Sequence, residues 1–89
     1  MAYTVNSIIY NTPCEEGLMG HVFLSNGYGA VVIEIAAGGS YEIAFLKQQD
    51  SNTWAAVIDE KLATISQVND LRTLTADEVN NYLAQLELL

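Results

Sequence analysis

Cys14 and His21 are the residues of this 89-residue chain whose types best suit nucleophilic catalysis. They stand seven positions apart, and the sequence offers no obvious third group to orient the histidine. Glu15 and Glu16 follow the cysteine directly, and their negative charge disfavours the thiolate form that a nucleophile needs. One cysteine and one histidine are also too few ligands for a zinc site. The sequence therefore predicts no thiol enzyme, no metal site and no cofactor.

Glycines and paired carboxylates are the other features with chemical potential. A phosphate-binding loop needs glycines that lead into the N-terminus of a helix, whereas "NGYG" at 26–29 and "GG" at 38–39 lead into expected strands. They are predicted to form turns. Glu34 and Glu42 have the geometry for general acid–base chemistry if they face each other, but nothing in the sequence indicates a pocket around them. An enzyme is the least favoured class.

Composition predicts a single domain over residues 1–89, with 51% hydrophobic and 16% charged residues. We expect a cytoplasmic protein, because the chain shows no membrane-spanning run or basic leader and its single cysteine fits a reducing compartment. Eleven acids against three bases give a net charge of −8. This charge argues against direct binding to nucleic acid or to an anionic membrane. It leaves two roles, solubility or attraction to a basic partner.

The elements that would position these residues form an α+β fold: an antiparallel β-meander of four to five strands with a C-terminal amphipathic helix packed on one face. The strands are expected at 3–10, 19–25, 28–36, 41–48 and 53–58, with 11–17 as a loop. Asn26-Gly27 predicts a two-residue type I′ turn that pairs Ser25 with Tyr28. Between the last strand and the helix, the pattern is ambiguous: Leu62–Ile65 is read as a short edge strand and 66–71 as a single helical turn.

The C-terminal helix is predicted over 76–88. Thr75 and Glu78 form a capping box at its start. A single apolar stripe follows at helical spacing, made of Val79, Tyr82, Leu83 and Leu86.

Alternation along the strands assigns two sheet faces. With an even register, the face under the helix is predicted to carry Val22, Leu24, Val31, Ile33, Ile35, Tyr41, Ile43 and Phe45. The second face then carries Phe23, Tyr28, Ala30, Val32, Ala44 and Leu46, with His21, Glu34 and Glu42 among them. That face is too apolar for an ordinary solvated surface. Either residues 3–10 and 59–74 fold over it, or it is an interface with a second copy or a target protein. Trp54 fits either a core anchor or a binding hot spot.

The order "NGYG", "YEIAFLK" and "LTADEVNNYLAQLELL" over residues 26–89 resembles a group of small phage-encoded proteins with an NGYG hairpin, a YE(I/L)A strand and a (T/S)xxEV helix. The resemblance implies a bacteriophage origin and a role in host takeover or counter-defence. In size and charge the chain is also similar to anti-CRISPR proteins, which implies stoichiometric binding to a basic, nucleic-acid-binding host effector in the host cytoplasm.

The leading functional hypothesis is therefore a non-enzymatic inhibitor whose carboxylates replace phosphates against Lys and Arg of its target. The residues expected at the partner interface are the acids Glu15, Glu16, Glu34, Glu42, Asp59 and Glu60, with Phe23 and Tyr28 as apolar anchors. The alternative is a small structural or assembly module that forms a homodimer through the apolar second face of the sheet.

Overall fold

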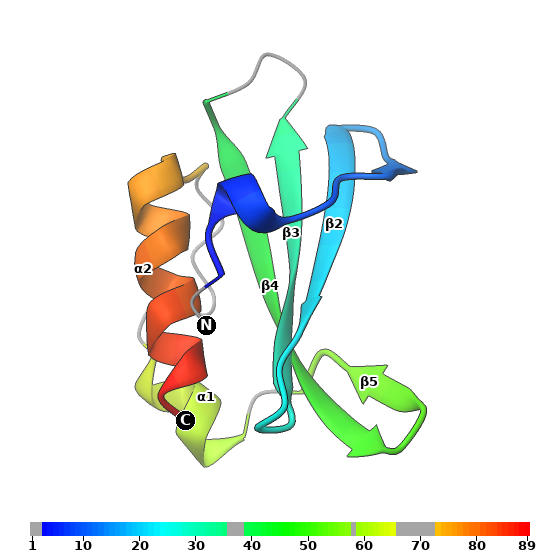
Figure 1. The fold of residues 1–89 in the computed structure, drawn as a ribbon, viewed down its shortest axis with the longest axis vertical. Coiled ribbons are helices and arrows are strands. Elements are labelled where there is room, and N and C mark those ends of the chain that lie inside the picture. The colour runs from blue at the N-terminus through cyan, green and yellow to red at the C-terminus, as the bar shows by residue number, and fades with distance from the viewer. Residues whose placement is uncertain (1–2, 36–38, 58, 66–72) are drawn as a thin grey trace.

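A computed structural model describes residues 3–35, 39–57, 59–65 and 73–89 of the protein. Five strands form one sheet in the order β1-β2-β3-β4-β5, and each neighbouring pair is antiparallel. Figure 1 shows long central strands and a curled end where β5 turns away with the end of β4. The strand bounds are Thr12–Pro13 (β1), Gly17–Phe23 (β2), Tyr28–Ile35 (β3), Tyr41–Asp50 (β4) and Thr53–Ala55 (β5). The predicted meander is confirmed.

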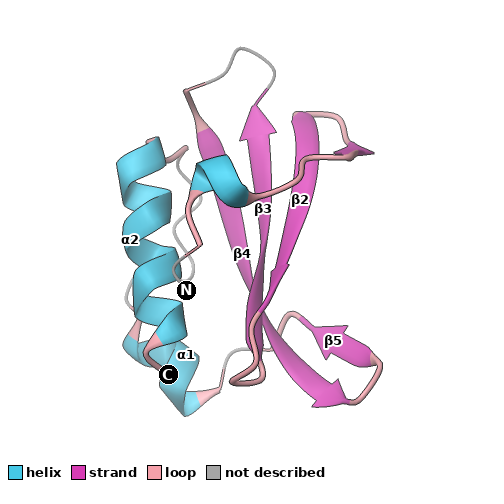
Figure 2. Cartoon of the chain, in the orientation of Figure 1, coloured by secondary structure: helices cyan, strands magenta, loops and turns pink. Residues whose placement is uncertain are grey.

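Helix α2, Ala76–Glu87, packs against β3 and β4 (Figure 2). The predicted capping box is present: the Glu78 amide donates to the Thr75 hydroxyl at 3.2 Å, and the Thr75 amide donates to the Glu78 carboxylate at 3.0 Å. The predicted apolar stripe is buried as a unit, comprising Val79, Tyr82, Leu83 and Leu86. The α+β fold class with its C-terminal helix is therefore confirmed. Within the described residues, no helix has the length and apolar character to cross a bilayer.

The Asn-Gly hairpin exists, but its turn is one residue longer than predicted. The Leu24 amide donates to the Tyr28 carbonyl at 2.9 Å, and the Gly27 amide donates to the Leu24 carbonyl at 3.3 Å. Gly27 has φ +87°, the left-handed conformation that closes a three-residue hairpin loop. Asn26 donates to the Leu86 carbonyl at 3.0 Å, which ties this turn to the end of α2.

The N-terminal segment does not form the predicted strand. Val5–Ser7 is a short 3-10 helix, η1, because the Ser7 hydroxyl accepts from the Thr4 amide and donates to the Thr4 carbonyl. Val5 and Ile8 then join the core on the helix side of the sheet. The segment that carries Ile8 and Ile9 crosses β2 at Gly20. An added Cβ there would overlap Ile8 and lie 2.8 Å from the Ile9 carbonyl oxygen.

Helix α1, Glu60–Thr64, replaces the expected edge strand at Leu62–Ile65. Asp59 caps it by accepting from the Leu62 amide at 2.8 Å. Leu62 and Ile65 are buried in the same core as α2. The helical turn expected at 66–71 lies outside the described residues, whereas Leu74 pairs with Tyr41 through two backbone hydrogen bonds just before α2.

Both predicted hairpin registers are wrong by one residue. Val22 lies opposite Ala30 rather than Val31, and Val31 lies opposite Ala44. A one-residue slip moves side chains to the other face, so β3 is inverted relative to the prediction. Tyr28, Ala30 and Val32 face α2 in the core. The faces of β2 and of residues 41–46 of β4 are as predicted.

Candidate functional site

The side of the sheet opposite α2, called the open face below, is the most distinctive surface of the described chain. The expectation that residues 3–10 and 59–74 cover it is not met by the parts that are described, because their buried side chains join the α2 core. Directly paired residues share a face, so the register defines its members. Its members other than glycine are Thr12, Met19, His21, Phe23, Val31, Ile33, Ile35, Glu42, Ala44, Leu46, Gln48 and Trp54.

An aromatic row occupies one end of the open face. The ring of Phe23, which is 50% exposed, lies 4.8 Å from that of Trp54 between centroids. His21 stacks on Phe23 as well, with ring centroids 5.8 Å apart and planes 19° from parallel. Gly29 lies beneath, and an added Cβ there would sit 3.2 Å from Trp54 Cζ3. The row therefore brings together side chains from β2 and β5 across a glycine of β3.

Carboxylates lie at the other end of the open face. Glu42 is paired with Ile33, and Gly17 is paired with Ile35. Glu15 and Glu16 form the tight turn that precedes Gly17, closed by two backbone hydrogen bonds between Cys14 and Gly17. Glu15 and Glu16 are exposed and Glu42 is half-buried. Three of the expected acids thus gather near one end of one surface.

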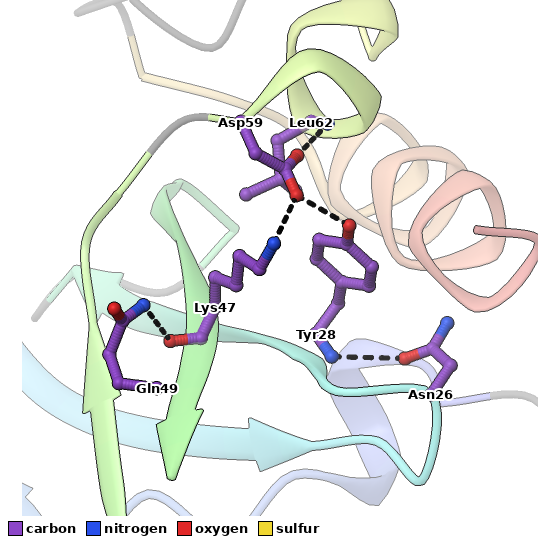
Figure 3. Close-up of polar contacts among 6 residues, drawn as sticks. All are labelled: Asn26, Tyr28, Lys47, Gln49, Asp59 and Leu62. Atoms are coloured by element: carbon purple, nitrogen blue, oxygen red, sulfur yellow. Dashed lines mark hydrogen bonds and ion pairs between the residues drawn. The ribbon is translucent and has the colours of Figure 1, made fainter.

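Tyr28 and Asp59 have a different environment, in a polar cluster on the helix side of the sheet (Figure 3). One Asp59 carboxylate oxygen accepts from the Tyr28 hydroxyl at 2.6 Å and from Lys47 Nζ at 2.8 Å. The Leu62 amide, then Lys47 and Tyr28, hold the pKa of Asp59 well below its usual range. The same contacts raise the pKa of Tyr28 and of Lys47. This cluster ties the start of α1 to β3 and β4.

Glu34 lies on the helix side as well, opposite Tyr41 and Leu18. Burial, followed by the charge of Glu34 and hydrogen bonding to it, raises the pKa of Tyr41. Burial, Tyr41 and Glu34 also raise the pKa of Tyr10 to about 12. The predicted proximity of Glu34 to Glu42 is wrong, because the two lie on opposite faces of the sheet. No acid–base pair of the kind considered from the sequence is formed.

The other chemical candidates are also separated. Cys14 lies beside Gly17, and four residues of extended strand, about 13 Å, separate Gly17 from His21. Within the described residues no group of three or more potential ligand side chains converges as a metal site would require.

The expected interface residues divide into two groups. Phe23 and Glu42 belong to the open face, with Glu15 and Glu16 at its edge, whereas Tyr28, Glu34 and Asp59 make contacts on the helix side. Glu60 is exposed on α1. Sequence reasoning assigned Val31, Ile33 and Ile35 to the core, because only the register distinguishes them from their equally apolar neighbours.

Searches of protein-family models, curated proteins and solved structures find no match to this chain.

Proposed function

We propose that this chain is a non-catalytic inhibitor that binds a basic, nucleic-acid-handling protein of a bacterial host, in the manner of an anti-CRISPR protein, and that the open face is its contact surface. The observation that carries the proposal is the chemistry of that face. It presents aromatic and aliphatic side chains with carboxylates at one end, and no described lysine or arginine projects from it. Surfaces of this kind mark protein contacts.

The charge distribution supports a basic partner. Of the three basic residues, Lys47 is paired with Asp59 on the helix side and Lys61 lies on α1. Neither of these lysines therefore offsets the carboxylates on the open side of the described chain, whose net charge is −8 over the full sequence. A protein that normally binds nucleic acid presents clustered Lys and Arg, to which carboxylates are complementary. Such complementarity accelerates association and makes it sensitive to salt.

The alternative, a homodimeric assembly module, uses the same face. It is supported by the same apolar side chains, because an isologous dimer would bury them against each other. Salt distinguishes the two cases: a charge-guided complex weakens as salt rises, whereas an apolar dimer persists or tightens.

The test is inhibition of purified CRISPR effectors, loaded with guide RNA, in a DNA-cleavage assay. We expect cleavage by the target effector to fall in proportion to added chain and to stop near equimolar ratio, with inhibition weakening at high salt. The triple variant E15Q/E16Q/E42Q removes the acids near the open face and should weaken inhibition by tenfold or more, on the order of 0.5 kcal/mol for each charge. The matched variant E60Q/D77N/E87Q removes the same charge from the helices and should weaken it less. Equal loss from both variants would contradict the placement of the contact, and absence of inhibition across effector classes would contradict the function.

A further inference from the structure

The aromatic row of the open face is built as a shallow platform rather than as a core cluster. Phe23 is 50% exposed and His21 is exposed, whereas Leu46, which pairs with the glycine beneath, is 9% exposed. Trp54 reaches over Gly29 to contact Phe23. Because position 29 has no side chain, the indole lies directly on the backbone. The platform therefore combines a packed base with accessible aromatic rings.

We propose that this platform, His21–Phe23–Trp54, takes an arginine side chain from the basic partner, while the carboxylates at the opposite end of the face take a second basic group. This inference rests on the proposed function and specifies the chemistry of the partner. A guanidinium is planar and weakly hydrated, so it stacks on aromatic rings at a smaller desolvation cost than a lysine ammonium. The negative charge of the whole chain favours a cation at both ends of the face.

The size of the open face argues against a second copy of this chain as the occupant. Strands β2, β3 and β4, seven to ten residues long, and the three-residue β5 form the face. With strands about 4.8 Å apart, it measures roughly 20 Å by 20 Å, or about 400 Å². A dimer formed on this face alone would bury about 800 Å² in total, below the roughly 1,200 Å² of stable protein interfaces. It would also bring together two chains that each carry a charge of −8. A basic partner is attracted by the negative charge of this chain, whereas a second copy is repelled by it. The surface of a basic partner can also extend beyond the open face.

The test compares two probes of equal charge, octa-arginine and octa-lysine peptides, by calorimetry and by fluorescence of Trp54, the only tryptophan. At about 0.15 M salt, we expect octa-arginine to bind at least about tenfold more tightly and to change the Trp54 emission. Phe23→Ser should abolish the preference for arginine, and His21→Ser, at an exposed position, should reduce it without risk to the fold. Ile9→Ser is the matched control, because Ile9 is 76% exposed and lies outside the face.

Equal affinity for the two peptides, or an arginine preference that survives Phe23→Ser and His21→Ser, would overturn the inference. So would a dimer in light scattering that Phe23→Ser dissociates, because a second copy would then occupy the face. The failures are distinguishable: effector inhibition without an arginine preference refutes only the platform, whereas an arginine preference without inhibition of any effector refutes the proposed function.

Discussion

Gly29→Ala tests whether the structure places Trp54 on the backbone of β3. An added Cβ at position 29 would overlap the Val22 carbonyl oxygen and approach Trp54 Cζ3 to 3.2 Å. The carbonyl belongs to the neighbouring strand and cannot rotate away as a side chain would. We therefore expect one methyl group to disturb both the β2–β3 pairing and the aromatic row.

The magnitude follows from two opposing terms. Overpacking costs about 1–3 kcal/mol, and replacing glycine by alanine inside a strand returns about 0.5–1 kcal/mol. Because the obstructing atom is backbone, the cost lies in the upper part of its range and the net loss is about 1–2 kcal/mol. For a domain of this size, that lowers Tm by roughly 4–16 °C. Thermal unfolding followed by circular dichroism measures it.

Gly20→Ala is the matched control. It also introduces an overlap, with Ile8 and the Ile9 carbonyl, but it lies on the helix side of the sheet, away from Trp54. Both variants should lose stability, and only Gly29→Ala should shift the native Trp54 emission. If Gly29→Ala left both Tm and emission unchanged, Trp54 would not lie where the structure puts it, and the platform proposed above would lose its basis.

Two further predictions concern the helix side. Asp59→Asn should lower the stability of the fold at neutral pH and reduce the further loss of stability in acid. The folded-state pKa of Asp59 lies below the unfolded value of 3.8. The stabilisation by the Asp59 carboxylate is therefore present above about pH 4 and is lost as the pH falls below that value. Urea unfolding at pH 7 and pH 3 measures this, with Glu60→Gln as control, and parallel losses in wild type and Asp59→Asn would contradict it. Leu83→Ala should cost about 2–5 kcal/mol because Leu83 is 1% exposed, whereas Leu88→Ala, at a position 86% exposed, should cost under about 0.5 kcal/mol. Similar values for the two, from denaturant unfolding, would contradict the orientation of α2.

The C-terminal helix could be predicted because its signals are local. The capping box lies within four residues, and the apolar stripe repeats at the helical period over two turns. The N-terminal segment failed for an equally local reason. Its β-branched residues favour a strand, but the hydrogen bonds between Thr4 and Ser7 stabilise a turn of 3-10 helix instead.

The composition of the two faces could be predicted only in part because register depends on turn geometry. The Asn-Gly signal correctly located the hairpin, but it did not distinguish a two-residue turn from the three-residue loop that Gly27 closes. That difference exchanged Tyr28 and Glu34 between faces relative to β2. The separate one-residue error in the β3–β4 register is what separated Glu34 from Glu42. The grouping of Glu15, Glu16 and Glu42 near one end depends on the pairing of three strands, which the sequence does not specify by itself.

That the described residues leave one apolar face of the sheet uncovered does not depend on that register. Residues 30–33 of β3 are Ala, Val, Val and Ile, so either parity of the strand presents apolar side chains. A strand that is apolar on both sides requires cover on both sides. The described helices, α1 and α2, and the described N-terminal segment all bury their apolar side chains in one core, which covers one face of the sheet. The other side of β3, with Val31, Ile33 and Ile35, is left half-buried at the surface. The apolar face that the described residues leave open thus follows from the strand composition together with the side on which the described helices pack, and the register decides only which residues lie on it.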